Sequence, residues 1–321
     1  MTSISATDVR TFAEGARPFS TGVNSSALHV LQDWAVDALG AGSVRLRALA
    51  DCADDEAGFA CVTVLGSPTA LAENLPSGRE PQRAIAALEA HSGLSIRGLL
   101  PLNTAGENAM LTLAAAAAAG VDLIDADGCG RVFPRIEQTM FTLADVPLSP
   151  AAVVSPFGEL VIVDAPTERA AVVLPKMVSA SGGWSFFMGY PSRGSTLTRI
   201  ANPGTVSRFL NAEAGAHLAG VPHRVLCRAS ITAIEVLRHA ASTRISVLLR
   251  EASPQARLLR IEADEQFFLV LGDGAKLASS PDDILLVSES GEVIDPDRCT
   301  VGMRVDVVVI DVPAVWHERR N

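Results

Sequence analysis

Aromatic residues are scarce in this sequence, because Phe, Trp and Tyr together make up 5% of its 321 residues and tyrosine occurs once. Since 48% of the residues are hydrophobic, the core has to be built mainly from Ala, Val, Leu and Ile. Long apolar runs are also missing, and the longest alanine-rich stretch, Leu111 to Ala119, is too short to span a bilayer. The start of the chain lacks the basic and apolar regions of a secretory signal peptide. We therefore expect a cytoplasmic globular protein that has no membrane partner.

Positive charge is also in deficit, because 26 Lys and Arg face 36 Asp and Glu and give a formal net charge of −10. This balance argues against nucleic-acid binding, which needs a basic face, and against adhesion to anionic lipid. The cysteines are scattered and form no CxxC pair: Cys52, Cys61, Cys129, Cys227 and Cys299. Their spacing favours reduced thiols and disfavours a structural zinc site.

Signatures of nucleotide cofactors are absent as well. The sequence has no Walker A loop. It also lacks the GxSxG nucleophile elbow of α/β-hydrolases. The glycines Gly40 and Gly42 end a predicted helix instead of joining a strand to one, so they do not form a dinucleotide-binding fingerprint. No nucleotide cofactor is expected, and the need for any other cofactor stays open.

The first half of the chain alternates between helical and strand patterns. Apolar residues recur at helical spacing over residues 25–39, 80–91 and 110–119. Short apolar runs between them indicate strands at residues 44–49, 59–65, 99–102 and 121–124. Residues 104–108 are expected to form a polar loop. Strands separated by helices form right-handed crossovers, so we predict an α/β fold with a mostly parallel open sheet and flanking helices.

The pattern changes after about residue 150. Apolar runs on both sides of Pro156 and Gly158 predict a hairpin. Helices are expected over residues 167–178 and 206–218, and a strand over 184–188. Turn signals then separate short strands at residues 245–249, 258–261, 267–271, 284–287 and 305–310. This pattern predicts a β-rich (α+β) C-terminal domain, a barrel or a sandwich, and we place the two domains at 1–165 and 166–321.

The segment from Val121 to Pro134, VDLIDADGCGRVFP, joins a buried strand to polar residues at its end. The apolar run stops at Asp125 and Asp127, and a glycine-rich turn then leads to Arg131. Open α/β sheets build their sites at the carboxyl ends of the strands. Two other strand ends, at residues 66–68 and 103–108, should lie on the same edge. We expect the three segments to surround one crevice.

Several motifs, in a fixed order, carry a family pattern over most of the chain. They are VLGSPTALAENLPSG from Val64, Gly106-Glu-Asn108, residues 121–143 with their Asp-Ala-Asp-Gly-Cys-Gly-Arg motif, Pro203-Gly-Thr-Val-Ser207, and a tail from SPDDILLVSESGEVI to VGMRVDVVVIDVPAVW. Together they resemble the DUF917 family, also described as the S-methyl thiohydantoin desulfurase domain family, which is associated with hydantoinase or oxoprolinase genes. One departure lies at residues 19–26, where members carry a run of glycines and this chain has only Gly22.

The resemblance implies a hydrolytic enzyme that removes a sulfur substituent from a small cyclic thiohydantoin or hydantoin-type compound. Water would attack the ring carbon that bears the S-methyl group, and the intermediate would expel methanethiol. Such a reaction needs a base, an acid and donors for the ring carbonyl. Asp125 and Asp127 are the predicted catalytic residues. The predicted substrate-binding residues are Glu107, Asn108, Arg131, Gly66, Pro68 and Thr205.

The side chains support these roles chemically, but each also has a structural interpretation. Two neighbouring carboxylates raise the pKa of one of them when both are desolvated, and Arg131 can hold a substrate carboxylate. Thr205 stands at a predicted helix start, where free N–H groups can bind an anion. A turn and helix-cap role for Asp125 and Asp127, and ordinary capping for Thr205, stay open.

Three other interpretations also stay open. Cys129 could act as a nucleophile, although no histidine lies near it in the sequence. A divalent metal could bind the two aspartates and Glu137, whereas His217 and His223 lack a standard zinc spacing and are expected to have surface or core roles. The chain could instead be a non-catalytic partner or accessory subunit of a hydantoinase- or oxoprolinase-type enzyme, with a large exposed apolar patch, or form a homo-oligomer.

Overall fold

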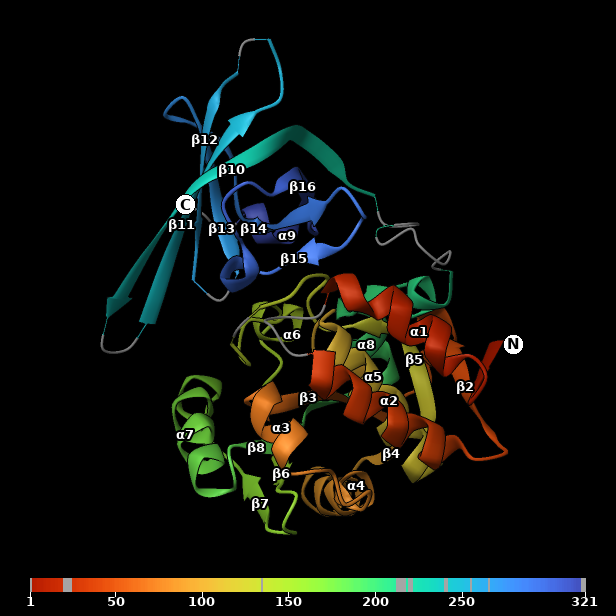
Figure 1. The fold of residues 1–321 in the computed structure, drawn as a ribbon. Coiled ribbons are helices and arrows are strands. Elements are labelled where there is room, and N and C mark those ends of the chain that lie inside the picture. Colours follow the sequence, from red (N-terminus) through yellow and green to blue (C-terminus); the bar gives the residue numbers. More distant parts are fainter. Residues whose placement is uncertain are drawn as a thin grey trace. The chain divides into compact units, whose positions relative to one another are not determined.

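The computed structural model describes residues 2–19, 25–133, 135–211, 218, 222–239, 242–254, 256–264 and 266–318. The chain divides into two compact units, of which the first ends at Asn211 and the second follows it (Figure 1). Strand β8 (Trp184–Arg193) belongs to the sheet of the first unit. The first compact unit therefore continues past residue 165, and the domain boundary at that residue stays a prediction.

A mixed sheet forms the centre of the first unit, in the order β1-β2-β5-β4-β3-β8-β6-β7. The other strands on this path are β1 (Thr2–Ser5), β2 (Ser43–Ala48), β3 (Ala57–Gly66), β4 (Ser95–Pro101), β5 (Asp122–Asp127), β6 (Ala151–Val154) and β7 (Leu160–Val163). The middle strands β2, β5, β4 and β3 are parallel. The outer pairings are antiparallel. The α/β class is confirmed. The sheet is mixed because β1, β8 and the predicted hairpin, which forms β6 and β7, add antiparallel pairings on both sides of the parallel strands.

Helix α5 (Gly106–Ala119) lies against the parallel strands on one face of the sheet. Eleven of its fourteen residues are buried, since alanine side chains let the helix approach both the sheet and its neighbours α1 (Val9–Ala16), α2 (Ser25–Leu39) and α4 (Glu80–Ser92). The helix begins four residues before the predicted start. Residues 106–108, predicted as loop, form its first turn, which places Glu107 and Asn108 on a rigid element.

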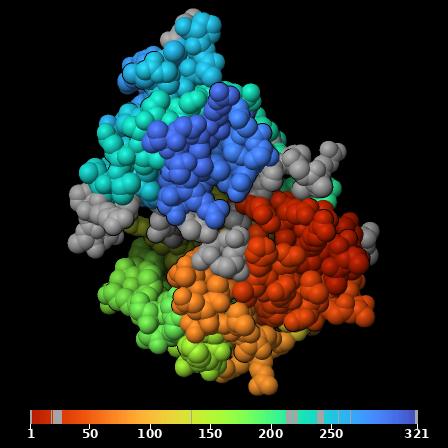
Figure 2. Space-filling view, in the orientation of Figure 1, coloured from red at the N-terminus to blue at the C-terminus, as the bar shows by residue number. Residues whose placement is uncertain are grey.

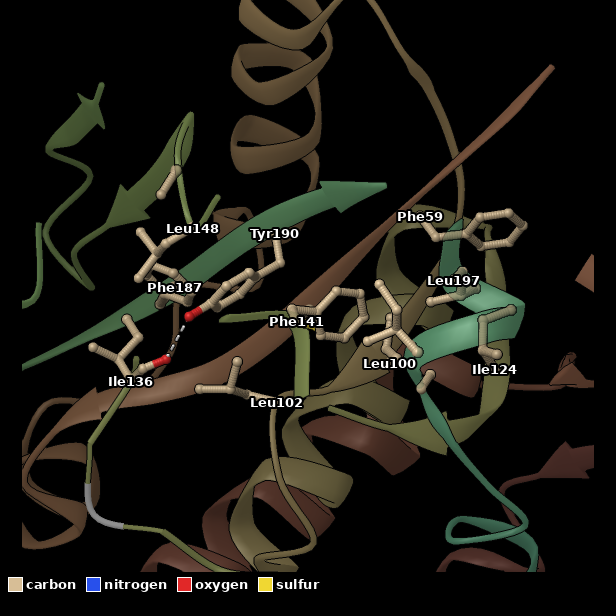
Figure 3. Close-up of a cluster of buried hydrophobic side chains, with 14 of the residues drawn as sticks. Phe59, Leu100, Leu102, Ile124, Ile136, Phe141, Leu148, Phe187, Tyr190 and Leu197 are labelled. Atoms are coloured by element: carbon tan, nitrogen blue, oxygen red, sulfur yellow. Dashed lines mark hydrogen bonds between the residues drawn. The ribbon is translucent and has the colours of Figure 1, made fainter. Parts of the chain in front are cut away.

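The other face of the sheet packs on a separate hydrophobic cluster. Alternate strand residues face it, as the period of two requires, and they include Phe59, Leu100 and Ile124 (Figure 3). Helices α6 (Met140–Leu143), α7 (Thr167–Ala180) and α8 (Gly194–Ile200) also contribute to the cluster, together with η2 (Leu49–Cys52) and loop residues. The elements that complete the unit are η1 (Arg17–Phe19), α3 (Pro68–Glu73), β9 (Asn202–Pro203) and η3 (Ser207–Asn211).

The second unit is a closed six-stranded barrel, which decides between the two predicted β architectures. Its strands are β10 (Arg224–His239), β11 (Ser242–Glu251), β12 (Leu258–Ala263), β13 (Phe267–Gly272), β14 (Ala275–Ser288) and β16 (Arg304–Ile310). The pairing of β13 with β14 closes the circle. Every second residue of β16, Val305, Val307 and Val309, points into the barrel core. The short elements β15 (Val293–Ile294), η4 (Pro296–Arg298) and α9 (Val315–Glu318) follow or flank these strands.

Two predictions about helices and loops are resolved only in part. The helix predicted over residues 206–218 begins as the 3-10 turn η3, and residues 212–217 lie outside the described part of the chain. Of residues 19–26, where the resemblance leads one to expect a run of glycines, residues 20–24 are also outside it.

In the described ranges, every helix is too short or too polar to cross a membrane.

Candidate functional site

The carboxyl ends of β3, β4 and β5 are tied together by backbone hydrogen bonds. Leu102 N–H donates to Val62 O at 2.8 Å, which joins the end of β4 to β3. Gly128 N–H donates to Pro101 O at 3.2 Å and joins the turn after β5 to β4. Residues 103–108 and 125–131 therefore meet at one edge of the sheet, as their positions after parallel strands predict.

Asn108 uses its side chain to hold this edge together. Its Oδ1 accepts hydrogen bonds from Thr63 Oγ1 at 2.8 Å and Val64 N–H at 3.0 Å, and its Nδ2 donates to Asn103 Oδ1 at 2.8 Å. Asn103 Nδ2 in turn donates to Phe133 O at 3.2 Å. The Asn108 amide is buried and occupied, so the structure gives it a positioning role between β3, α5 and the loop after β5.

Asp127 is completely buried and caps the glycine-rich turn. Its Oδ1 accepts the backbone N–H of Cys129 at 2.6 Å and that of Gly130 at 2.5 Å. Asn202 Nδ2 donates to its Oδ2 at 3.4 Å. Burial raises the pKa of this carboxyl group, although the two backbone hydrogen bonds act in the opposite direction.

Asp125 is half-buried and caps a different element. Its Oδ1 accepts the backbone N–H groups of Val206 at 3.1 Å and Ser207 at 2.8 Å, at the start of η3. Strand β9 pairs with residues 126 and 127 of β5, and Gly204 N–H donates to Asp125 O at 2.9 Å. The motif Pro203-Gly-Thr-Val-Ser207 is thereby wrapped over the end of β5, so it meets the aspartate motif in space.

Other polar residues of these segments are also buried. Glu107 is 4% exposed in the first turn of α5, and Arg131 is 5% exposed, with its guanidinium stacked 4.2 Å from the Phe133 ring centre. Arg131 Nε donates to Val132 O at 2.9 Å, and Thr104 N–H donates to Arg131 O at 3.5 Å. The hydroxyls of Thr104 and Thr205 are buried and have no hydrogen-bond partner among the described residues.

The segment 66–68 lies differently from the other two strand ends. Gly66 has φ +106°, and a side chain there would collide with Gly183 O and Val178 Cγ1. Ser67 N–H donates to Gly183 O at 2.9 Å, and Pro68 begins α3. The contacts of Gly66 thus run toward α7 and β8, and a substrate-binding role for Gly66 and Pro68 stays a prediction.

Cys129 is buried behind the turn that Asp127 caps. Its Sγ contacts Leu102 O and Gln138 O, each at 3.1 Å. Burial raises the pKa of the thiol well above its ordinary value, and the neighbouring Asp127 acts in the same direction. These surroundings favour a structural thiol over a nucleophilic thiolate.

Within the described ranges, no three His, Cys, Asp or Glu side chains lie close enough together to bind a metal ion. Glu137 pairs with Arg135 at 3.7 Å. His223 is exposed, and His217 lies outside the described residues. Metal content stays a question for elemental analysis.

Three residues that hydrogen-bond to Asn108 or to the segment after β5 were not among the predicted site residues, namely Thr63, Asn103 and Tyr190. Asn103 stands directly after a predicted strand, and a residue of its type at a strand end is a recognised turn former. Thr63 and Tyr190 carry no comparable signal, because each lies within an apolar strand run.

The fold and the motifs agree with comparisons to known proteins. The crystal structure of a Chromobacterium violaceum protein, a structural-genomics target, superposes with a TM-score of 0.76 at 18% identity, covering 98% of this chain and 93% of that one. At this identity the likeness shows the fold alone. No curated protein matches the chain. The model of the S-Me-THD-like N-terminal domain matches residues 7–165 and that of the C-terminal domain matches residues 166–321, so the chain belongs to the S-Me-THD-like family.

Proposed function

We propose that this protein is a hydrolase that removes a sulfur substituent from a small cyclic thiohydantoin-type compound at the carboxyl edge of β3, β4 and β5. The observation that carries the proposal is the gathering of buried polar groups at this edge. Arg131 and the hydroxyl of Thr104 follow two neighbouring strands, and Asp125 lies at the end of one of them. The hydroxyls of Thr104 and Thr205 are buried and have no hydrogen-bond partner among the described residues. Such unpaired hydroxyls are costly, so a ligand that pairs with them is favoured.

The reaction has simple requirements. Water adds across the C=N bond at the ring carbon that bears the S-methyl group, so that a base removes one of its protons and the ring nitrogen gains a proton. The tetrahedral intermediate then loses its hydroxyl proton and expels methanethiol as the sulfur gains a proton. The ring carbon ends as a carbonyl and the product is a hydantoin. A carboxylate can take the proton from water and return one to the leaving sulfur.

We assign the base to Asp125 and a positioning role to Asp127. Asp125 is half-buried, its Oδ1 is fixed by two backbone N–H groups, and no hydrogen bond to its Oδ2 is recorded within the described ranges. A carboxylate held by one oxygen can present the other to water. Asp127 is fully buried and engaged with its own turn, which supports a role in holding Asp125 and Arg131 in place.

The remaining groups suit recognition of the ring. Arg131 carries a permanent positive charge in a buried setting, where it can stabilise negative charge that develops on the ring. Thr104 and Thr205 can each donate or accept a hydrogen bond. Glu107, in the first turn of α5, can accept a hydrogen bond from a ring N–H.

The test is a turnover assay with an S-methyl thiohydantoin, in which methanethiol release and ring opening are followed separately by chromatography. Asp125→Asn keeps an oxygen that can accept the two backbone N–H bonds but cannot take a proton, so we expect turnover to fall by about 10²- to 10⁴-fold. Asp122→Asn is the matched control, because Asp122 lies at the opposite end of β5 and pairs with Arg45. Equal activity of Asp125→Asn and the parent chain would remove Asp125 from the mechanism.

A second candidate, an accessory subunit of a hydantoinase-type enzyme, is favoured by one surface feature. Leu75 and Phe157 are 61% and 64% exposed, and Gly182 contacts Phe157 and Asn74, the residue before Leu75. Phe157 packs on this glycine, and Asn74 donates to its carbonyl oxygen at 3.0 Å. The orange α3 region and the green α7 region both reach the surface in Figure 2. Co-purification with such an enzyme, together with no turnover by the isolated chain, would favour this candidate.

We also propose a cytoplasmic location for this activity. All five cysteines are free and buried, which supports a reducing compartment.

A further inference from the structure

Tyr190, the single tyrosine of the chain, has a strained backbone inside a strand. Its φ is +52°, in the left-handed region that bulky side chains rarely adopt. The register between β3 and β8 shifts at this point, because Phe59 pairs with Ser192 but Cys61 pairs with Gly189. Such a bulge re-aims a side chain, and strain of this kind persists only where the surroundings hold it.

The tyrosine side chain is held by the segment that follows β5. Its hydroxyl lies 3.0 Å from Ile136 O, to which it can donate (Figure 3). It also lies 2.8 Å from Thr142 Oγ1, from which it can accept. Its ring packs on Phe141, with the ring centres 5.5 Å apart. Three residues of one short segment thus converge on a side chain that is 1% exposed.

The same segment closes the base of the loop that carries Arg131. Met140 N–H donates to Gly128 O at 2.8 Å, and Cys129 Sγ contacts Gln138 O at 3.1 Å. A side chain on Gly128 would meet Leu102 O at 2.7 Å, so the clamped turn also fits tightly against the end of β4.

We propose that Tyr190 is a positioning residue, whose bulged backbone delivers its hydroxyl to Ile136 and Thr142 and thereby fixes the loop that presents Arg131. A buried tyrosine needs hydrogen-bond partners in any protein. Here, however, the chain adopts an unfavourable backbone conformation to reach them, and both partners lie in the segment that clamps the loop. The effect on turnover rests on the proposed function, whereas the effect on the loop does not.

The first test is hydrogen exchange in Tyr190→Phe, which removes only the hydroxyl. We expect the amides of residues 128–139 to exchange at least fivefold faster, while those of β3 and β4 are unchanged. Ser246→Ala is the control, because Ser246 Oγ is a buried hydroxyl of the barrel that makes two hydrogen bonds, with Glu262 and Arg260. Unchanged exchange in residues 128–139 of Tyr190→Phe, or an equal acceleration there in Ser246→Ala, would overturn the proposal.

A second variant and a kinetic measurement complete the test. If Tyr190→Phe does not fold, Thr142→Val removes the other partner from a half-exposed position, and at least a twofold acceleration in residues 128–139 is expected. With an active parent chain, we expect kcat of Tyr190→Phe to fall at least tenfold with an unchanged pH profile, because Asp125 is untouched. An unaltered kcat of the folded variant contradicts the positioning role. If the parent chain turns over no thiohydantoin, the proposed function fails, and hydrogen exchange alone decides the role of Tyr190.

Discussion

Asp125 Oδ1 accepts a hydrogen bond from the backbone N–H of Ser207 at 2.8 Å, although 82 residues separate the two in the sequence. The contact ties the end of β5 to the start of η3 and brings two family motifs together. One oxygen of the carboxylate thus caps a turn, and the proposed function assigns the chemistry to the other. Structural and catalytic interpretations of Asp125 are therefore compatible, and suitable variants can separate them.

The structural part of this role predicts a difference between two substitutions. Asp125→Ala removes the acceptor for Val206 and Ser207, and loss of such a cap costs about 1–2 kcal/mol of unfolding free energy. Asp125→Asn retains an acceptor and should lose less than about 0.5 kcal/mol. Urea denaturation of the three proteins measures the difference. An equal loss of stability in both variants would show that the two backbone hydrogen bonds contribute nothing.

Asp127 predicts a pH dependence of stability with a definite sign. Burial raises its pKa above the ordinary value of 3.8, so the folded chain holds this proton more tightly than the unfolded chain. The protonated Asp127 therefore contributes to the free energy of unfolding. This contribution is full below pH 3.8 and is lost as pH rises through the elevated pKa of the folded state. Asp127→Asn has no such proton. We expect it to be more stable than the parent at pH 7, with an advantage that shrinks toward pH 4.

The measurement is urea denaturation of both proteins at several pH values between 4 and 8. Asp122→Asn serves as the control for removal of a carboxylate from the same strand, because Asp122 is only half-buried. An advantage of Asp127→Asn that grows on acidification would reverse the predicted sign and contradict a raised pKa.

Asn108 is predicted to be a major contributor to stability. Asn108→Ala removes three hydrogen bonds, two buried and one partly buried, and leaves Thr63 Oγ1, Val64 N–H and Asn103 Oδ1 with one partner fewer. We expect a loss of about 2–4 kcal/mol, since unpaired buried polar groups are costly. Asn202→Ala removes only one long hydrogen bond of 3.4 Å and should cost about 0.5 kcal/mol. Similar midpoints of urea unfolding for the two variants would contradict the assignment.

Much of the fold follows from patterns that are local in the sequence. The helical spacing of residues 25–39 and the apolar run of residues 59–65 correspond to α2 and β3, because packing reinforces those local preferences. Helix α5 begins early because of a local side-chain contact that hydrophobic spacing does not show. Asn103 Oδ1 accepts the N–H of Ala105 at 3.0 Å and shapes the turn before the helix, and no periodicity reveals that contact.

The details of the site were less predictable because they depend on partners distant in the sequence. Adjacent parallel strands explain why residues 103–108 and 125–131 meet. They do not reveal that β9 returns to pair with β5, or that β8 enters the same sheet. The end of β3 at Gly66 is likewise explained by the antiparallel pairing of this residue with Trp184, which carries residues 66–68 toward α7.

Experiments on Cys129 can distinguish a nucleophilic thiol from a structural one. Its burial and its raised pKa predict that a thiol reagent will label it only after unfolding. Cys129→Ser keeps a donor for Leu102 O or Gln138 O, so we expect kcat to stay within tenfold of the parent value. A nucleophile replaced by serine would instead lose several orders of magnitude. Cys299→Ser, a change at another buried thiol, controls for the substitution itself. Rapid labelling of Cys129 in the folded chain, together with loss of turnover in folded Cys129→Ser, would transfer the chemistry from Asp125 to this thiol.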